Sequence, residues 1–410
     1  MPLKKTIRLL SLILHVSGFW KGSAIILSQG LNRLLDKQYC KNPINSNLIL
    51  FESDPPFTDN ARVLYEYMIQ RELDKNYTLL WKVDDVKTYK RLSEKGIDCV
   101  LGHSLFPRFG KHRYYFYGRT AHWIFHTHGH AFGNGYRKEQ TIVNLWHGGM
   151  GFKSNKLIDN PSTYTLISGN GEICYSVAEN FHRCKREAFL PFGMMRTDLL
   201  FKEKNIPSID AVPGKKILWM PTFRHTNNPY TEDPTVNTET GLPIINSLNE
   251  LQNLNETLSS LNIHLYIKLH RRQDANSVMH TDMTHIHMLS NESIEAVGLQ
   301  LYEIFNHFDA MISDYSSVSF DYLYLDRPLG YTLDDFDKYK ESRGFVMDNP
   351  LDYMPGHHIY TYEDFIQFVT DIAEGNDTFG SDREQVRNAV GLNEGGTCCQ
   401  KLLDFLGIKN

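Results

Sequence analysis

The sequence lacks most of the short motifs that identify a cofactor or a metal. It has no Walker loop, no GxGxxG after a predicted strand and no GxSxG, so ATP, dinucleotides and an α/β-hydrolase serine have no local support. Its six cysteines have no CxxC spacing and form no zinc pattern. The neighbours Cys398 and Cys399 cannot easily form a relaxed disulfide, and a reducing, cytoplasmic setting is the simpler interpretation.

Long apolar runs and a strong net charge are also missing. No run reaches the roughly 20 residues that a spanning helix needs, and no convincing cleavage site follows the apolar residues 9–14. The net charge of −5 gives no general reason to expect nucleic acid as a partner. Residues 1–45, however, have a net charge of +6, with Phe19 and Trp20 beside amphipathic stretches. This segment is predicted to contact an anionic membrane surface, and the alternative is a first helix packed on the protein.

Apolar runs alternate with helical patterns along the rest of the chain, which predicts parallel sheets with crossover helices. At 410 residues the length suggests two domains or one large one. The first set has strands at 47–53, 77–83, 123–126 and 141–146, with helices at 59–73 and 87–95. The second set has strands at 217–220, 265–269, 286–288 and 310–313, with helices at 248–261 and 299–308.

A polar stretch with two prolines and a glycine separates the two sets and is the predicted linker. The predicted fold is therefore α/β, with two doubly wound Rossmann-like domains that face each other across a crevice. The predicted parts are a membrane-contact segment (1–45), an acceptor-side domain (46–203), a linker (204–216) and a donor-binding domain (217–410).

The stretch 309–328, DAMISDYSSVSFDYLYLDRP, is the most informative in the chain. A short strand is followed by Asp314, Ser316 and Ser317 in a tight turn, and then by a helical pattern that ends at Pro328. A helix N-terminus with hydroxyl donors suits a phosphate group. The alternative is an ordinary capped helix, because Asp and Ser are common caps.

Other polar residues follow predicted strands, where ligands of open parallel sheets bind. His147 lies in a WHGG turn after one strand and could take a proton from a hydroxyl, although a histidine packed in a loop is the alternative. The second set of strands is followed by cationic or donor groups that suit a pyrophosphate. These residues are Thr222, Arg224, Lys268 and His270, with Arg196 and Arg343 as further cations.

The HTHGH stretch (126–130) invites a metal-binding interpretation, which we do not favour. No carboxylate or cysteine cluster accompanies its three histidines, and alternate residues on a strand can share a face without binding anything. His357 and His358 are interpreted in the same way. We therefore expect no metal site.

Several motifs, in the same order along residues 47–400, resemble the CDP-glycerol glycerophosphotransferase family, the teichoic-acid primases and polymerases of bacteria. The motifs are FESDPPFTDNARVLYEYM (51–68), NLWHGG (144–149), FGMMRTDLL (192–200), ILWMPTFR (217–224), YIKLH (266–270), ISDYSSVSFDYLYLDRP (312–328) and YKESRGF (339–345). The resemblance implies a glycosyltransferase-B type fold and no metal requirement. It also implies transfer of a polyol phosphate from CDP-glycerol or CDP-ribitol to a hydroxyl of a lipid-linked or polyol-phosphate acceptor, releasing CMP.

The resemblance assigns roles to matching residues. It implies that His147 is the general base on the acceptor hydroxyl and that His270 contacts the donor pyrophosphate. Phosphoryl transfer needs such positioned donors and cations around developing charge. The other donor-side candidates are Ser316, Ser317, Thr222, Arg224, Lys268, Asp314, Asp321 and Arg343, and the acceptor-side candidates are Lys153, Arg196 and Asp198.

The chain departs from the family where the acceptor side is expected. The usual Thr-Pro-Leu-Lys after Trp-His-Gly is replaced by residues 149–153, GMGFK, so the lysine is displaced by one position and the proline is lost. Family members work at the inner face of the membrane, which supports a peripheral membrane role for 1–45. Two alternatives stay open: a glycosyltransferase of the same fold that uses a nucleotide sugar, and a non-catalytic scaffold that keeps the fold.

Overall fold

The structure is a computed structural model. It describes residues 23, 38–102, 114–128, 136–154, 162–222, 239–269, 283–392 and 394–409.

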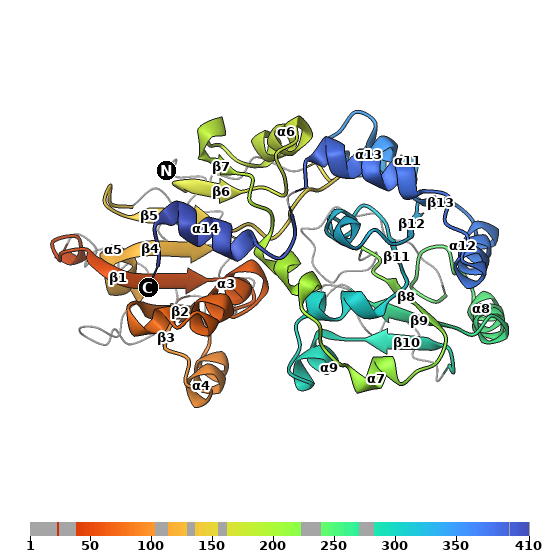
Figure 1. Ribbon diagram of the computed structural model, residues 1–410, viewed down its shortest axis with the longest axis horizontal. Helices are drawn as coiled ribbons and strands as arrows, with labels where there is room; N and C mark the ends of the chain where they lie inside the picture. The colour runs from red at the N-terminus through yellow and green to blue at the C-terminus, as the bar shows by residue number, and fades with distance from the viewer. Residues whose placement is uncertain are drawn as a thin grey trace. The chain divides into compact units, whose positions relative to one another are not determined.

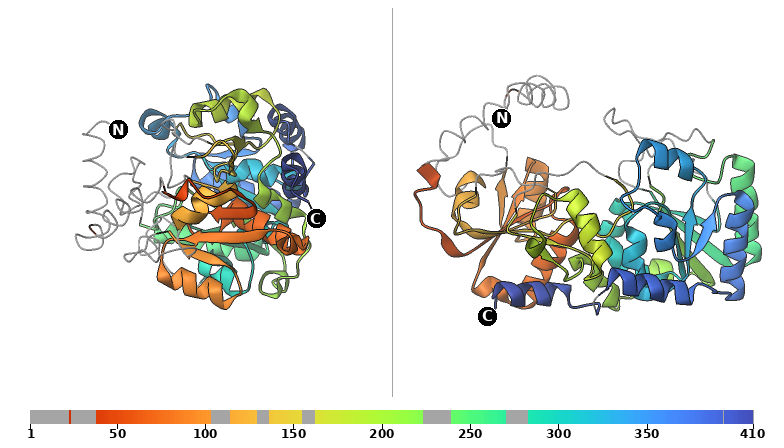
Figure 2. Two further views of the ribbon diagram at one scale, coloured as in Figure 1. Left: turned by 90° about the vertical axis from the view of Figure 1, so that its left-hand side faces the viewer. Right: turned by 90° about the horizontal axis from the view of Figure 1, so that it is seen from above.

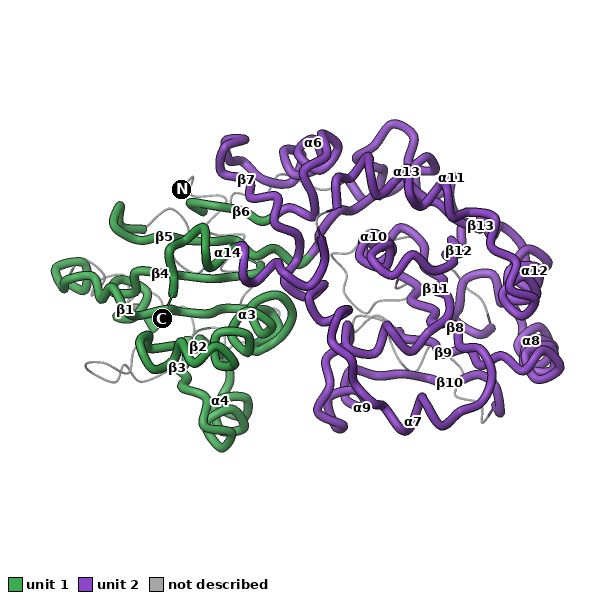
Figure 3. Tube along the Cα trace, viewed as in Figure 1, with its two compact units in different colours: residues 1–147, 159–166, 402–410 green, residues 148–158, 167–401 purple. Residues whose placement is uncertain are grey.

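Contacts divide the chain into two compact units, which are coloured separately in Figure 3. Unit 1 comprises Met1–His147, Asp159–Leu166 and Leu402–Asn410, and unit 2 comprises Gly148–Ile158 and Ile167–Lys401. The division differs from the predicted boundary at 204–216, because residues 167–203 group with unit 2 and the C-terminal residues group with unit 1.

Six parallel strands of unit 1 lie in the order β3-β2-β1-β4-β5-β6 (Figure 1). They are β1 (Asn45–Glu52), β2 (Thr78–Val83), β3 (Cys99–Leu101), β4 (Ala121–His126), β5 (Thr141–Asn144) and β6 (Tyr164–Leu166). The order reverses between β1 and β4, the type of position at which ligands bind in doubly wound sheets. At the carboxyl edge, Glu52 lies opposite His126, and His126 lies opposite Asn144.

The helices of unit 1 follow from apolar spacing. They are α3 (Asp59–Gln70), α4 (Val86–Glu94) and α5 (Tyr114–Thr120), with a 3₁₀ turn η1 (Leu73–Lys75). α3 buries Ala61, Leu64 and Met68, which recur at helical spacing. One face of the sheet packs Leu50, Ile124 and other apolar residues against Tyr114 of α5. The core is therefore built on the central strands, which carry continuous apolar runs.

Unit 2 repeats the same strand order with a second parallel sheet, β10-β9-β8-β11-β12-β13 (Figure 1). Figure 2 shows the ribbon from two further sides. These strands are β8 (Lys215–Trp219), β9 (Ile263–Lys268), β10 (Ile286–Leu289), β11 (Ala310–Ser313), β12 (Leu329–Thr332) and β13 (His357–Ile359). Here the order reverses between β8 and β11, so the residues that follow these two strands lie at the corresponding position.

Helices and turns complete unit 2. The helices are α6 (Glu172–Phe181), α7 (Pro207–Asp210), α8 (Leu248–Ser260), α9 (Asn291–Ala296), α10 (Val318–Tyr322), α11 (Phe336–Ser342), α12 (Tyr362–Glu374) and α13 (Gly380–Val390). Shorter elements are β7 (Phe189–Leu190), η2 (Arg186–Ala188), η3 (Met195–Phe201), η5 (Leu301–Glu303), η6 (Phe305–His307), η7 (Leu323–Leu325) and η8 (Pro350–Tyr353). α8 and α12 cover one face of the sheet with leucines and phenylalanines. α14 (Cys398–Leu406) contributes residues to both units.

The predicted fold class is confirmed, since both units are parallel α/β layers, and the predicted strands occur within a few residues of their expected bounds. Two expectations need correction. The segment 299–308 is not one helix but the two 3₁₀ turns η5 and η6, in which Tyr302 and Phe305 stack at 4.6 Å in the interior. The predicted linker 204–216 contains α7 and the first residues of β8.

Candidate functional site

The turn that carries His147 has a backbone conformation that bulky residues rarely adopt. Trp146 has a φ of 54°, in the left-handed region, and it is buried. Its N–H donates to Asn144 Oδ1 at 2.9 Å, which ties it to the end of β5. Such a conformation costs on the order of 1–3 kcal/mol and persists only where its surroundings hold it. The turn therefore holds half-buried His147 at a fixed place in unit 1.

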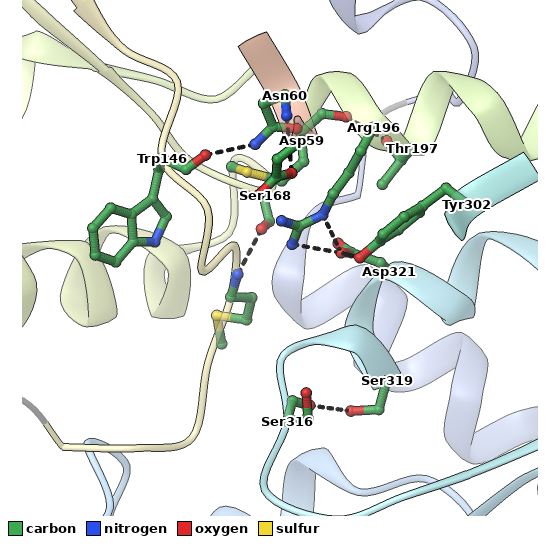
Figure 4. Close-up of polar contacts among 12 residues, drawn as sticks. Asp59, Asn60, Trp146, Ser168, Arg196, Thr197, Tyr302, Ser316, Ser319 and Asp321 are labelled. Carbon is green, nitrogen blue, oxygen red and sulfur yellow. Dashed lines mark hydrogen bonds and ion pairs between the residues drawn. The ribbon is translucent and has the colours of Figure 1, made fainter. Parts of the chain in front are cut away.

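Asn60 of α3 supports the same turn and was not identified from the sequence. Its buried Nδ2 donates to the carbonyl oxygens of Leu145, at 3.0 Å, and Trp146, at 2.7 Å (Figure 4). The residue lies within the 51–68 motif, but no role was assigned to it. The available signal was an asparagine at the start of a predicted helix inside this motif.

The imidazole of His147 is held by the segment that follows β4. Its Nδ1 lies 3.2 Å from the carbonyl oxygen of Thr127, and because a carbonyl can only accept, Nδ1 carries the hydrogen. Nε2 then bears the lone pair, which is the form a general base needs. The ring also stacks on His128, with the centroids 3.7 Å apart and the planes 6° from parallel.

Gly149 explains one departure from the family pattern. Its φ is 56°, and a Cβ there would lie 3.2 Å from Arg196 Nη2 and 3.3 Å from Ser168 Oγ. The next N–H, of Met150, donates to Ser168 Oγ at 2.7 Å (Figure 4). A threonine at 149 would be strained in this backbone and crowded by these neighbours, so glycine fits this chain.

In unit 2, three predicted residues meet where β8 and β11 end. The buried carboxylate of Asp314 accepts from Thr222 twice, from N–H at 2.7 Å and from Oγ1 at 2.5 Å. Lys153 Nζ donates to the same Thr222 hydroxyl at 3.3 Å. Asp314 was predicted to bind the donor, but its oxygens hold the β8 loop in place. Lys153, predicted on the acceptor side, groups with the donor-side residues of unit 2.

Ser316 and Ser317 are the half-buried residues of an otherwise buried turn. The Ser316 carbonyl oxygen accepts from Ser319 Oγ at 3.1 Å (Figure 4), and Ser317 precedes α10 without a side-chain cap. Within the described part of the chain, neither the Ser316 nor the Ser317 hydroxyl forms a hydrogen bond. The alternative of an ordinary helix capped by one of these two serine side chains is therefore not what this turn forms. Because α10 has only five residues, its dipole is small, and the hydroxyls are the stronger candidates for ligand contact.

Lys268, the last residue of β9, is a buried cation. It is 5% exposed, and its Nζ donates to the carbonyl oxygen of Leu269 at 2.9 Å. Burial lowers the pKa of Lys268 to about 8, while the charge of Glu292 acts in the opposite direction. Among the described residues, Lys268 forms no ion pair. A buried ammonium group of this kind is favourable toward a phosphate, which would raise its pKa again.

Arg196 and Asp321, predicted on opposite sides of the reaction, form one buried ion pair in unit 2. Arg196 donates to Asp321 Oδ2 from Nε at 3.0 Å and from Nη2 at 2.8 Å (Figure 4). The hydroxyl of Tyr302 donates to the same oxygen at 2.5 Å. Both charged residues are almost fully buried, so the described geometry gives them a structural partner rather than a ligand.

Asp198 also has a structural partner in unit 2. Its carboxylate accepts from the N–H groups of Cys398, at 2.8 Å, and Cys399, at 2.9 Å, which are the first two residues of α14. It therefore satisfies two of the donors that a helix N-terminus leaves open. The three predicted acceptor-side residues therefore do not form one group. Lys153 lies near Thr222, whereas Arg196 and Asp198 hold the segment 167–203 within unit 2.

Arg343 ends α11, and the strand-like pairing beside it holds the segment of Lys153. The N–H of Ser154 donates to the Gly344 carbonyl oxygen at 2.9 Å, and Lys153 forms an antiparallel bridge with Phe345. Arg343 is half-buried and its N–H donates to Tyr339. The SRGF motif is thereby brought next to the cluster formed by Lys153, Thr222 and Asp314.

Several predictions fall outside the described residues, namely those for His270, Arg224, His130 and nearly all of 1–45. Of the HTHGH histidines, His126 Nε2 lies 3.0 Å from Ser162 Oγ, whereas His128 stacks on His147. In the described ranges, no group of three or more His, Cys, Asp or Glu side chains could hold a metal ion.

Two parallel α/β units of the same strand order form a fold of the glycosyltransferase-B type. In each unit, polar side chains follow strand ends, where such sheets bind ligands. The chain belongs to the CDP-Glycerol:Poly(glycerophosphate) glycerophosphotransferase family, whose model matches residues 35–406. The family expected from the motifs is therefore confirmed.

Relatives and solved structures agree with this family. The chain is 24% identical over 297 residues to the teichoic acid ribitol-phosphate primase of Bacillus spizizenii, covering 66% of this chain and 70% of the relative. It is 25% identical over 257 residues to the teichoic acid glycerol-phosphate primase of Bacillus subtilis, covering 57% and 60%. The structure of the wall teichoic acid polymerase TagF matches with a TM-score of 0.70 and 20% identity, over 93% of this chain and 92% of that one, and shows the same fold.

Proposed function

We propose that this chain transfers a glycerol phosphate, or a related polyol phosphate, from a CDP-linked donor to a hydroxyl group of an acceptor, with release of CMP. The family match over residues 35–406 carries this proposal, and the Nδ1–H form of His147 supports it. The names of the two primases refer to ribitol phosphate and glycerol phosphate, and one matching TagF structure was obtained with CDPG. The donor is accordingly CDP-glycerol or CDP-ribitol.

His147 acts as the general base in this proposal. The acceptor hydroxyl oxygen forms a bond to the phosphorus that bears the polyol, and the bond from that phosphorus to the bridging oxygen of CMP breaks. Nε2 of His147 takes the hydroxyl proton, while Thr127 holds Nδ1–H and stabilises the imidazolium that forms. CMP leaves with the negative charge on its phosphate.

The donor pyrophosphate is neutralised by side chains rather than by a metal. Lys268 supplies a buried ammonium at the end of β9, and Lys153 supplies another beside Thr222. Ser316 and Ser317 supply hydroxyl donors at the end of β11. Positioned charges and donors of this kind stabilise the transition state of phosphoryl transfer. The resemblance adds His270, Arg224 and Arg343 to the same role.

The acceptor in this proposal is lipid-linked or a polyol phosphate, and the enzyme works as a peripheral protein at the cytoplasmic face of the membrane. Residues 1–45 have a net charge of +6 and would contact anionic lipid. Among the described residues, no helix is long and apolar enough to cross a bilayer. The product joins a teichoic-acid-like or capsular polymer.

The test is CMP release by the purified full chain with CDP-glycerol or CDP-ribitol, with and without a polyol-phosphate acceptor and anionic vesicles. His147→Ala and His270→Ala are compared with His122→Ala, a matched histidine near the other end of β4. A parallel reaction contains EDTA. Acceptor-dependent CMP that the first two variants lose and the third keeps is expected, with EDTA having no effect.

Other outcomes would replace the proposal. Release of a nucleoside diphosphate from a nucleotide sugar, with no CMP from either CDP donor, would identify a glycosyltransferase of the same fold. Unchanged CMP release by His147→Ala would remove the base from the mechanism. Inhibition by EDTA would overturn the metal-independent form.

A further inference from the structure

His128 of the HTHGH stretch, which the proposed function does not use, lies against the proposed base. β4 and β5 are paired so that His126 lies opposite Asn144, and the chain continues past the same edge of the sheet from each strand. Two residues beyond His126 comes His128, and three residues beyond Asn144 comes His147. Their rings meet face to face, 3.7 Å between centroids and 6° from parallel.

Thr127 and His128 restrain the ring of His147 in two directions, one in the plane of the ring and one perpendicular to it. The carbonyl oxygen of Thr127 accepts from Nδ1 in the plane of the ring, at 3.2 Å, which opposes rotation about the Cβ–Cγ bond. The ring of His128 covers one face, which opposes tilting. Thr127 Oγ1 lies 2.9 Å from Nδ1 of His128, so the covering ring is itself held.

We propose that His128 is a positioning residue for His147, which fixes the plane of the base so that Nε2 meets the acceptor hydroxyl in a productive direction. The proposal rests on the proposed function to the extent that His147 is the base. In this proposal His128, the second histidine of HTHGH, supports proton transfer by orienting His147, and it does not bind a metal. A flat aromatic ring is what the position requires, since stacking needs a ring face but no titratable nitrogen.

The alternative is that His128 only packs. Positioning affects the chemical step, whereas loss of packing affects folding and donor binding alike. A small misplacement of a catalytic group lowers the rate constant by about 10- to 100-fold without weakening the binding of substrate elsewhere. Donor binding is assigned to unit 2, so KM for the donor is the appropriate comparison.

The experiment compares His128→Ala, His128→Phe and wild type in CMP release, with kcat and donor KM measured separately. His128→Ala is expected to lower kcat about 10- to 100-fold with donor KM changed less than about twofold. His128→Phe is expected to stay within about threefold of wild type. Equal losses of kcat in both variants, an unchanged kcat in His128→Ala, or a loss that appears in KM instead would overturn the proposal.

A second measurement does not depend on turnover. Nitrogen-15 NMR of the histidine rings reports which nitrogen of His147 carries the hydrogen. Wild type and His128→Phe are expected to hold the Nδ1–H form. His128→Ala is expected to show a mixture of both forms, because a ring that can tilt no longer keeps Nδ1 on the Thr127 carbonyl oxygen. The two proposals can fail separately. If wild type is inactive with every CDP donor but its Nδ1–H form still depends on the ring at residue 128, the proposed function is wrong and the positioning role stands. A mixture in wild type would reject the positioning itself.

Discussion

Replacing Lys268 with methionine should stabilise the protein while weakening its hold on the donor. Methionine keeps the apolar stem and removes the buried ammonium. Burial lowers the pKa of Lys268 from 10.5 to about 8. At about 1.4 kcal/mol per pKa unit, the variant should gain about 3 kcal/mol in free energy of unfolding at pH 7. The lost hydrogen bond to Leu269 offsets about 1 kcal/mol of this gain.

The gain should depend on pH in a defined direction. Between about pH 8 and 10.5 the unfolded chain binds the lysine proton and the folded chain does not, so wild type recovers stability as the pH rises. The advantage of Lys268→Met should therefore shrink by about 2 to 3 kcal/mol between pH 7 and pH 10.

Urea unfolding at a series of pH values measures this difference, with Lys338→Met, at an exposed position on α11, as the control. A difference between Lys268→Met and wild type that is constant over this pH range would refute the reasoning. A raised donor KM in the same variant is expected from the proposed role, and it is measured separately by CMP release.

Two further predictions concern structural contacts of unit 2. Asp321→Asn leaves the Arg196 charge buried without its counterion. The variant should therefore lose about 3–5 kcal/mol in free energy of unfolding, measured with urea. A loss below about 1 kcal/mol would contradict a buried ion pair. Asp198→Ala removes the acceptor for the first N–H groups of α14 and should cost about 1–2 kcal/mol. It should also speed hydrogen exchange at Cys398 and Cys399, and unchanged exchange there would argue against the capping role.

The central strands could be predicted from the sequence because each is a short continuous apolar run. β11 was predicted with its observed bounds, since AMIS is apolar and is followed by turn residues. The edge strand β13, HHI, is too short and polar to give such a signal. The segment 299–308 was predicted as a helix because its apolar residues have helical spacing. The buried stack of Tyr302 and Phe305, together with the bond from Tyr302 to Asp321, favours two tighter turns instead.

The site could be predicted only in part, for a similar reason. Residue type and position along the sequence were sufficient to place His147, Lys268 and the serine pair at or just after strand ends, where the structure has them. They were not sufficient for Arg196, whose partner lies 125 residues further along, or for Asp198, whose partner lies 200 residues further along. A buried counterion or a capped helix turns a candidate ligand into a structural residue. A contact between residues so far apart in the sequence cannot be predicted from the spacing of residues around either one.

The division of the chain into units has a practical consequence for anyone who wishes to study them separately. The backbone passes from one unit to the other four times, after His147, Ile158, Leu166 and Lys401. No single cut of the gene can therefore yield two complete fragments, and a C-terminal truncation at 401 would take residues from unit 1 while leaving unit 2 entire. Separate expression would need unit 2 as a redesigned chain, with 148–158 joined to 167–401 by a new connection.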